Sequence, residues 1–184
     1  TTKQKISQTH RHYHHTPIAY IHTHSMVSDL KYSTVSDVVS SWNDLRRVPN
    51  FREVAGVKLF RKFFKMEPSA VQVFSFHKNQ EIDEKFLGSP RVVLHATHYM
   101  QMIDRAIDLL GPDIETLTVI LAELGERHSR FGVRPSMYGP MRTALIETLE
   151  EILGDKFTDE CKLSWAQMYD AIAYDMMWSG LKSL

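Results

Sequence analysis

Prolines and glycines divide most of this chain into segments of helical length. Between these breaks, apolar residues recur at intervals of three and four, which places them along one face of an α-helix. Almost no segment alternates with the period of a β-strand. We therefore predict an all-α fold of roughly six to eight helices. The predicted helices span about residues 34–47, 51–66, 90–110, 113–129, 135–153 and 159–178.

The first 33 residues differ from the rest of the chain. They hold six of the ten histidines and show no sustained helical or strand period. The six are His10, His12, His14, His15, His22 and His24. We assign residues 1–33 to an irregular, histidine-rich N-terminal extension and residues 34–184 to a single domain. Three interpretations of the extension stay open: a polar tail, a weak site for transition metals, or a contact with a partner.

Charge and composition exclude several classes of protein. Lys plus Arg and Asp plus Glu both number 22, and no long basic run offers a surface for nucleic acid. No stretch of about 18 apolar residues predicts a membrane span. The only cysteine, Cys161, cannot form an internal disulfide, which favours a reducing, cytoplasmic location. We expect a soluble protein that does not bind nucleic acid and has no membrane span.

Two histidines lie on helix faces that the apolar pattern marks as inward. His128 follows Leu124 by four residues on the apolar stripe of the helix predicted at 113–129. His95 begins the apolar stripe of the helix predicted at 90–110. A buried imidazole without a partner costs about 1–3 kcal/mol. Either each ring bonds to a backbone carbonyl, or one metal centre between the two helices explains both.

Three kinds of metal centre can be compared with these positions. A zinc site needs three or four ligands. The candidates for such a site are His95, His98, His128 and an acid such as Glu126. A di-iron carboxylate site needs paired Glu-x-x-His motifs, which the chain lacks. Haem needs only one histidine together with an apolar slot between helices, and the aromatic and methionine residues near these helices suit such a slot.

An ordered set of motifs over about residues 35–180 resembles the globins, and most closely their neuroglobin-like branch. F64-K-M-E-P-S-A-V-Q-V-F74 resembles the end of the globin B helix, the C-helix proline and the phenylalanine that stacks on haem. S89-P-R-V-V-L-H-A-T-H-Y resembles the E helix. L121-A-E-L-G-E-R-H-S-R-F-G-V133 resembles the F helix and the corner after it. Residues 144–157 and 164–172 resemble the G and H helices. The resemblance implies a globin fold around a haem pocket.

The resemblance also implies a non-covalently bound haem b and assigns roles to the residues around it. His128 would be the proximal iron ligand, and His95, about twenty-one residues after the stacking Phe74, the distal ligand. His98 replaces a residue that often pairs with a haem propionate, and it would serve there or compete with His95 for the iron. The other implied pocket residues are Phe60, which offers no hydrogen-bond donor, Tyr99, Val133 and Tyr138.

The neuroglobin-like branch further implies that His95 and His128 both coordinate the iron, which gives six-coordinate, bis-histidyl haem. Our main interpretation is a redox and ligand-binding protein rather than an enzyme. It would act in redox sensing, electron transfer or gas-linked signalling, with oxygen, nitric oxide or carbon monoxide as ligands and a redox partner protein.

Three alternatives stay open at this point. One is reversible oxygen binding for transport or storage, with His95 off the iron. Another is a nitric-oxide dioxygenase or peroxidase-like enzyme, which would need an external reductase because the chain lacks G-x-G-x-x-G. The third is an input module for a domain outside these residues.

Overall fold

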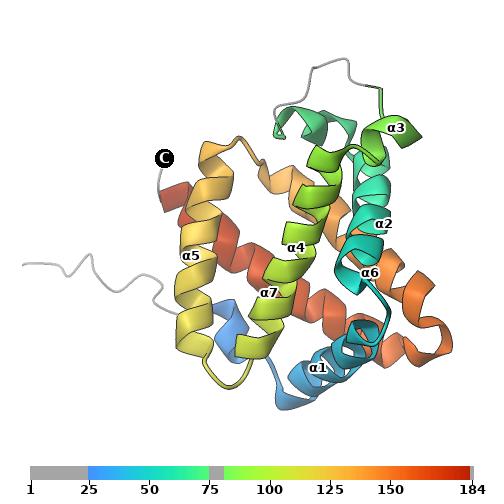
Figure 1. Ribbon diagram of the computed structural model, residues 1–184. Coiled ribbons are helices and arrows are strands. Elements are labelled where there is room, and N and C mark those ends of the chain that lie inside the picture. The colour runs from blue at the N-terminus through green and yellow to red at the C-terminus, as the bar shows by residue number, and fades with distance from the viewer. Residues whose placement is uncertain (1–24, 75–80, 183–184) are drawn as a thin grey trace, which may run out of the picture.

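The structure, a computed structural model, describes residues 25–74 and 81–182 (Figure 1). Every regular element in this part of the chain is a helix, so the predicted all-α fold is confirmed. The elements are η1 (Met26–Asp29), α1 (Tyr32–Arg46), α2 (Phe51–Met66), η2 (Pro68–Gln72), α3 (Glu84–Leu87), α4 (Pro90–Leu109), α5 (Ile114–Arg130), η3 (Pro135–Met137), α6 (Tyr138–Leu153), η4 (Gly154–Lys156) and α7 (Asp159–Lys182), where η denotes a short 3-10 helix.

A glycine and a capping residue define the turn between α4 and α5. Gly111, with a φ of 104°, lies in the turn between α4 and α5. The Asp113 carboxylate caps α5 by accepting a hydrogen bond from a backbone N–H three residues on (3.1 Å). Ser89 occupies the N-cap position of α4, but its side chain makes no capping bond. The helix predicted from residue 135 begins at Tyr138, because η3 forms first.

The segment Ser25–Val27 is attached to α7 through Asp175. The Asp175 carboxylate accepts hydrogen bonds from Ser25 Oγ (2.5 Å), Met26 N (2.8 Å) and Val27 N (3.2 Å), and the Val27 side chain is buried. These residues belong to the range 1–33 that we assigned to the extension. Residues 1–24, with their six histidines, lie outside the described residues.

The packing of the helices leaves α4 and α5 apart from each other. α2 packs against α4 and α6, while α7 packs against α5, α1 and α6. In Figure 1, α5 and α4 lie in front of α7, which crosses behind them. Because α4 and α5 have little direct contact, each is held in place by a different helix. The candidate site lies in the space between these two helices.

A buried ionic cluster joins α4 to α1 and α2 through Asp104. Its carboxylate accepts hydrogen bonds from Trp42 Nε1 (2.7 Å), Arg46 Nε (2.7 Å) and Arg52 (2.5 Å). Burial raises the pKa of the Asp104 carboxyl, but the hydrogen bonds from Trp42, Arg52 and Arg46 outweigh that effect and hold this pKa below its usual value. The charged form of Asp104 therefore stabilises the fold around α4.

We expect Asp104→Asn to lower the free energy of unfolding at pH 7 by about 3 kcal/mol, the low end for breaking a buried ion pair, because both arginines are partly exposed. With a depressed pKa, the contribution of the carboxylate is present above the unfolded-state pKa of about 3.9 and is lost as pH falls through the folded-state pKa. The gap between wild type and variant should therefore shrink below about pH 4, as measured by urea unfolding.

Asp108→Asn is the matched control for this prediction. Asp108 also pairs with Arg46 (2.5 Å), but its side chain is 62% exposed. An exposed ion pair contributes little to stability, so the variant should unfold nearly like the wild type. Equal destabilisation by the two substitutions would contradict the role given to the burial of Asp104.

Candidate functional site

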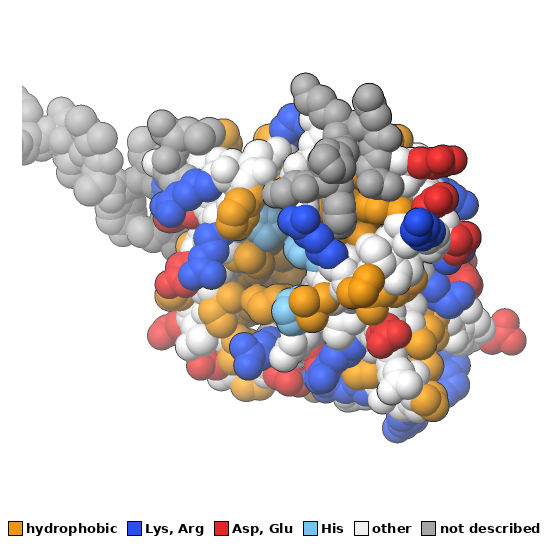
Figure 2. All heavy atoms as spheres, turned by 45° about the horizontal axis from the view of Figure 1, so that its top comes forward, with side chains coloured by type: hydrophobic (Ala, Val, Ile, Leu, Met, Phe, Trp, Pro, Cys, Tyr) orange, Lys and Arg blue, Asp and Glu red, His pale blue; other side chains and the backbone are white. Residues whose placement is uncertain are grey.

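A cavity of about 430 Å³ lies between α4 and α5, with α6 and α7 forming its inner wall. Figure 2 shows the hollow, with hydrophobic side chains inside it and histidines near its rim. The structure brings every predicted site residue to this cavity. They are Phe60, Phe74, His95, His98, Tyr99, His128, Val133 and Tyr138. Residues from four helices and two connecting segments therefore line one apolar space.

His128 lies in the last turn of α5, where the buried Leu117 and Leu121 hold one face of the helix inward. Its Nδ1 donates a hydrogen bond to the backbone carbonyl of Leu124 (2.9 Å). Since a carbonyl only accepts, this bond places the ring proton on Nδ1 and leaves the Nε2 lone pair available for a metal. The backbone N–H of Val133 donates to the His128 carbonyl (3.0 Å), which ties the corner to the helix end.

Burial lowers the pKa of the His128 imidazole, and the hydrogen bond to Leu124 offsets part of that effect. The imidazole is therefore neutral at pH 7, which is the form that binds a metal ion. The alternative considered from the sequence, a histidine paired with a backbone carbonyl, is correct for Nδ1. It leaves Nε2 unassigned, because no hydrogen bond joins that atom to another residue in ranges 25–74 and 81–182.

His95 lies on α4 and faces the same cavity from the opposite wall. Its ring packs edge-on against Phe74 (4.5 Å between ring centroids, 86°) and against Phe60 (5.5 Å). Burial lowers the pKa of His95, and the charges of His128 and His98 lower it further. His95 and His128 thus line the same cavity from α4 and α5.

His98 and Tyr99 follow His95 by one turn and differ in their surroundings. The His98 side chain is exposed, whereas the Tyr99 ring packs edge-on against Phe60 (5.6 Å) inside the cavity. Burial raises the pKa of the Tyr99 phenol well above its usual value, so Tyr99 stays a neutral hydrogen-bond donor. Among the three residues on this wall, His95 is the imidazole packed within the aromatic cluster and His98 the one at its edge.

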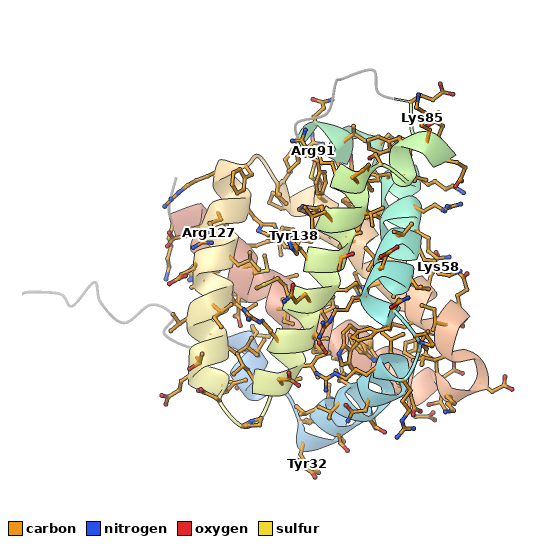
Figure 3. The ribbon with its side chains drawn as sticks, viewed as in Figure 1. Tyr32, Lys58, Lys85, Arg91, Arg127 and Tyr138 are labelled. Carbon is orange, nitrogen blue, oxygen red and sulfur yellow. The ribbon has the colours of Figure 1, made fainter. Side chains whose placement is uncertain are left out.

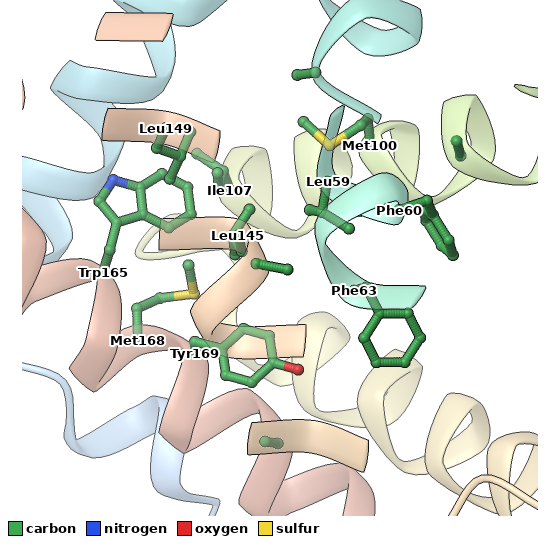
Figure 4. Close-up of a cluster of buried hydrophobic side chains, with 14 of the residues drawn as sticks. Leu59, Phe60, Phe63, Met100, Ile107, Leu145, Leu149, Trp165, Met168 and Tyr169 are labelled. Atoms are coloured by element: carbon green, nitrogen blue, oxygen red, sulfur yellow. The ribbon is translucent and has the colours of Figure 1, made fainter. Parts of the chain in front are cut away.

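The inner wall of the cavity includes residues that the sequence analysis did not assign to the site. Tyr169, Met168, Ile172 and Met176 of α7 face the cavity, as does Leu145 of α6. Figure 4 shows Tyr169 and Met168 projecting from α7 beside Leu145. Their helical spacing marks them as inward-facing, but spacing alone does not distinguish the wall of a cavity from a closed core.

The inner wall also holds two tyrosines, Tyr138 of α6 and Tyr169 of α7. Tyr138 lies between α5 and α4 in Figure 3, and burial raises the pKa of its phenol to about 12. Burial also raises the pKa of Tyr169, and the nearby Tyr99 and Tyr138 add to the shift. All three phenols are therefore uncharged at neutral pH, which keeps this side of the cavity without formal charge.

The donor set does not suit a bare metal ion. Across residues 25–74 and 81–182, no three His, Cys, Asp or Glu side chains lie close enough together to hold one. Glu126, considered as a zinc ligand, instead pairs with Arg130 (3.2 Å) on the same helix. Two neutral imidazoles on opposite walls of a deep apolar slot fit a flat apolar macrocycle that brings its own metal. Within the same ranges, no helix is long and apolar enough to cross a membrane.

Comparison with known proteins agrees with this geometry. A globin family model matches residues 57–176 of the chain. The neuroglobins of Tetraodon nigroviridis and Danio rerio are each 30% identical to it over 138 residues, which cover 74% of this chain and 83% of each relative. A solved structure, that of a hexacoordinated haem protein from an anhydrobiotic tardigrade, has a similar fold, with a TM-score of 0.72 at 19% identity. That match covers 83% of this chain and 96% of the tardigrade protein.

Proposed function

This chain belongs to the globin family, and we propose that the haem it binds is haem b, held without a covalent link in the cavity between α4 and α5. His128 of α5 is the proximal ligand. His95 of α4 is the distal ligand when no gas is bound. The observation that supports this most strongly is the hydrogen bond from His128 Nδ1 to Leu124, because it leaves Nε2 free to coordinate while His95 lies on the opposite wall.

The lining of the cavity supports haem b in particular. When bound, haem would supply an iron that changes oxidation state, and His128 and His95 would hold it. Phe60, Phe74, Val133 and Tyr138 would pack against the porphyrin and exclude water from it, and burying this apolar surface would contribute most of the retention. The lone Cys161 lies outside the cavity, so it provides no thioether attachment.

Coordination of the iron by both histidines favours electron transfer or redox sensing over the transport of gas in bulk. With the same two nitrogens on the iron in both oxidation states, little structural change accompanies electron transfer. His95 would also compete with gases. If His95 occupies the iron about 99% of the time, only about 1% of the protein can bind a gas at any moment. The apparent gas affinity then falls about 100-fold below the intrinsic affinity of the free iron site. We propose redox sensing, electron transfer to a partner protein, or signalling tuned by oxygen, nitric oxide or carbon monoxide.

Tyr99 favours a second candidate, reversible oxygen binding. Its phenol is neutral and lines the distal side of the cavity, so it provides a hydrogen-bond donor where Phe60 has none. In this mode His95 stays off the iron and the pocket stabilises bound oxygen. Stable oxygenated protein with slow autoxidation would select this function over the first.

The optical spectrum of the ferrous, ligand-free protein tests the main proposal. We expect sharp, split visible bands of low-spin iron, because two imidazoles give a strong axial field. The measurement is made anaerobically on haem-loaded protein reduced with dithionite. A single broad visible band of high-spin iron would show that His95 does not bind the metal.

A further inference from the structure

We infer that the close contact between α5 and α7 at Gly125 and Gly180 positions His128, and thereby sets whether His95 can bind the same iron. This inference rests on the proposed function, since it concerns how the two axial ligands are held. Neither Gly125 nor Gly180 lines the cavity. They act through the helix that carries His128.

The two helices approach so closely that Gly125 has no room for a side chain and a Cβ on Gly180 would make only tight contacts. A Cβ on Gly125 would lie 2.1 Å from the Met176 carbonyl oxygen and 2.7 Å from the Met176 carbonyl carbon. A Cβ on Gly180 would lie 3.0 Å from the Gly125 oxygen and 3.2 Å from Ser129 Cβ. Most of these atoms belong to helix backbone, which cannot rotate away as a flexible side chain can. The contact therefore defines how near α5 lies to α7.

This contact lies about one helical turn before His128 on α5. Gly125 precedes His128 by three residues and follows Leu124, whose carbonyl holds the His128 Nδ1. Met176, the residue that Gly125 touches, also lines the cavity. Any shift of α5 at this point therefore moves both the histidine and the carbonyl that orients it.

The position of α5 depends mainly on α7. α5 has its most extensive contact with α7 and little contact with α4. α4 is held separately, because a Cβ on Gly56 of α2 would lie 2.6 Å from the Ala96 carbonyl oxygen, next to His95. The two imidazoles thus belong to two helices with independent supports. The distance between them is set by how each helix is seated.

A second attachment supports α7 at the same level. Asp175, next to Met176, accepts the three hydrogen bonds from Ser25, Met26 and Val27. The short helix η1 that follows Ser25 contacts both α7 and α5. Residues 25–29, which precede α1, therefore pack against both helices of the α5–α7 contact.

Binding of one iron by both imidazoles tolerates little displacement. Ligand groups have to be held within about 0.5 Å of the productive geometry. A displacement of α5 that reaches this tolerance would weaken the second bond. If occupancy by His95 falls from about 99% to about 90%, the competent fraction rises from about 1% to about 10%, which is a tenfold change.

Gly180→Ala in the full-length, haem-loaded protein tests this inference. The added methyl group would lie 3.0 Å from the Gly125 oxygen and 3.2 Å from Ser129 Cβ, tight contacts that a small shift of α5 relative to α7 relieves, so the fold should be retained, as checked by far-UV circular dichroism. We expect the ferrous ligand-free spectrum to gain a high-spin component and the association rate of carbon monoxide to rise about tenfold. Gly139→Ala is the matched control, because a Cβ there meets nothing within 4 Å, and it should behave as wild type.

The double variant Gly180→Ala with Ser129→Gly provides a rescue. It removes one of the two contacts made by the new methyl group, so its spectrum should return toward that of Ser129→Gly alone. If Gly180→Ala by itself does not fold, the test instead compares the spectrum and association rate of the double variant with those of Ser129→Gly. A folded Gly180→Ala protein with the wild-type spectrum and wild-type association rate overturns the inference.

Failure of the proposed function gives a different result. If the wild-type ferrous protein is already high-spin, His95 is not a ligand, and the positioning of His128 is then read from the iron–histidine stretching band in the resonance Raman spectrum. A shift of that band in Gly180→Ala, absent from Gly139→Ala, supports the positioning role. An unchanged band overturns it.

Discussion

His128→Ala is expected to lose most of its haem. His128 is the imidazole held by a backbone hydrogen bond with Nε2 free, and no other residue of α5 replaces it on that wall. Loss of a partner that only supports a metal ligand lowers metal affinity about 10–100-fold, and loss of the ligand itself should exceed the upper value. The ratio of Soret to protein absorbance after purification, and the rate of haem transfer to an acceptor protein, measure the effect.

A rescue experiment separates loss of the ligand from damage to the fold. Free imidazole diffuses into the space left by the side chain and should restore haem retention, since it supplies the missing nitrogen. His98→Ala is the control, because it removes an exposed histidine from the same cavity rim and should keep its haem. A His128→Ala protein that retains haem with an unchanged ferrous spectrum would show that another residue is the proximal ligand.

His95→Ala is expected to keep haem and to bind gases much faster. The bond to His128 and the apolar lining remain, so haem stays in place. The competing imidazole is gone, so nearly all molecules become competent, and carbon monoxide association should rise about 100-fold if His95 had occupied the iron about 99% of the time. The ferrous spectrum should change from low-spin to high-spin. Flash photolysis and static spectra measure both effects.

Substitution of the neighbouring His98 tests which histidine is the distal ligand. His95 and His98 are both exposed, but the His95 ring packs against Phe74 and Phe60, whereas His98 lies one turn further along α4. The same substitution at His98 should therefore leave the spin state unchanged. A high-spin spectrum in His98→Ala, with a low-spin spectrum in His95→Ala, would move the distal ligand by one helical turn.

Much of the helical framework was predictable because the signals for it are local. Gly111 and Asp113 mark the turn between α4 and α5 through backbone conformation and capping, and neither effect depends on distant residues. The one-turn helix α3 was not predicted. Its sequence is charged, yet Phe86 and Leu87 are buried there by packing against α2 and α4, and the Asp83 carboxylate caps its start.

The candidate site was predictable in part for the same reason. His95 and His128 lie on apolar stripes whose direction follows from helical spacing, and the order of motifs placed Phe74 and Val133 near them. The residues contributed by α7 were missed as part of the site. The spacing of Tyr169 and Met176 shows that they point inward, but which element they meet depends on how helices far apart in the sequence are packed.

The amino-acid sequence by itself determined the helices, their inward faces and the two histidines on those faces, because each depends on residues within one or two turns of one another. The tertiary structure alone decided that the faces of α4 and α5 stay apart around a cavity, that Leu124 directs the His128 ring, and that Gly125 meets the backbone of α7. In the sequence Gly125 is only a weak helix former within a helical segment. Its role arises because two helix backbones far apart in the chain pack against each other, and the separation between helices is a property of their packing rather than of either sequence segment.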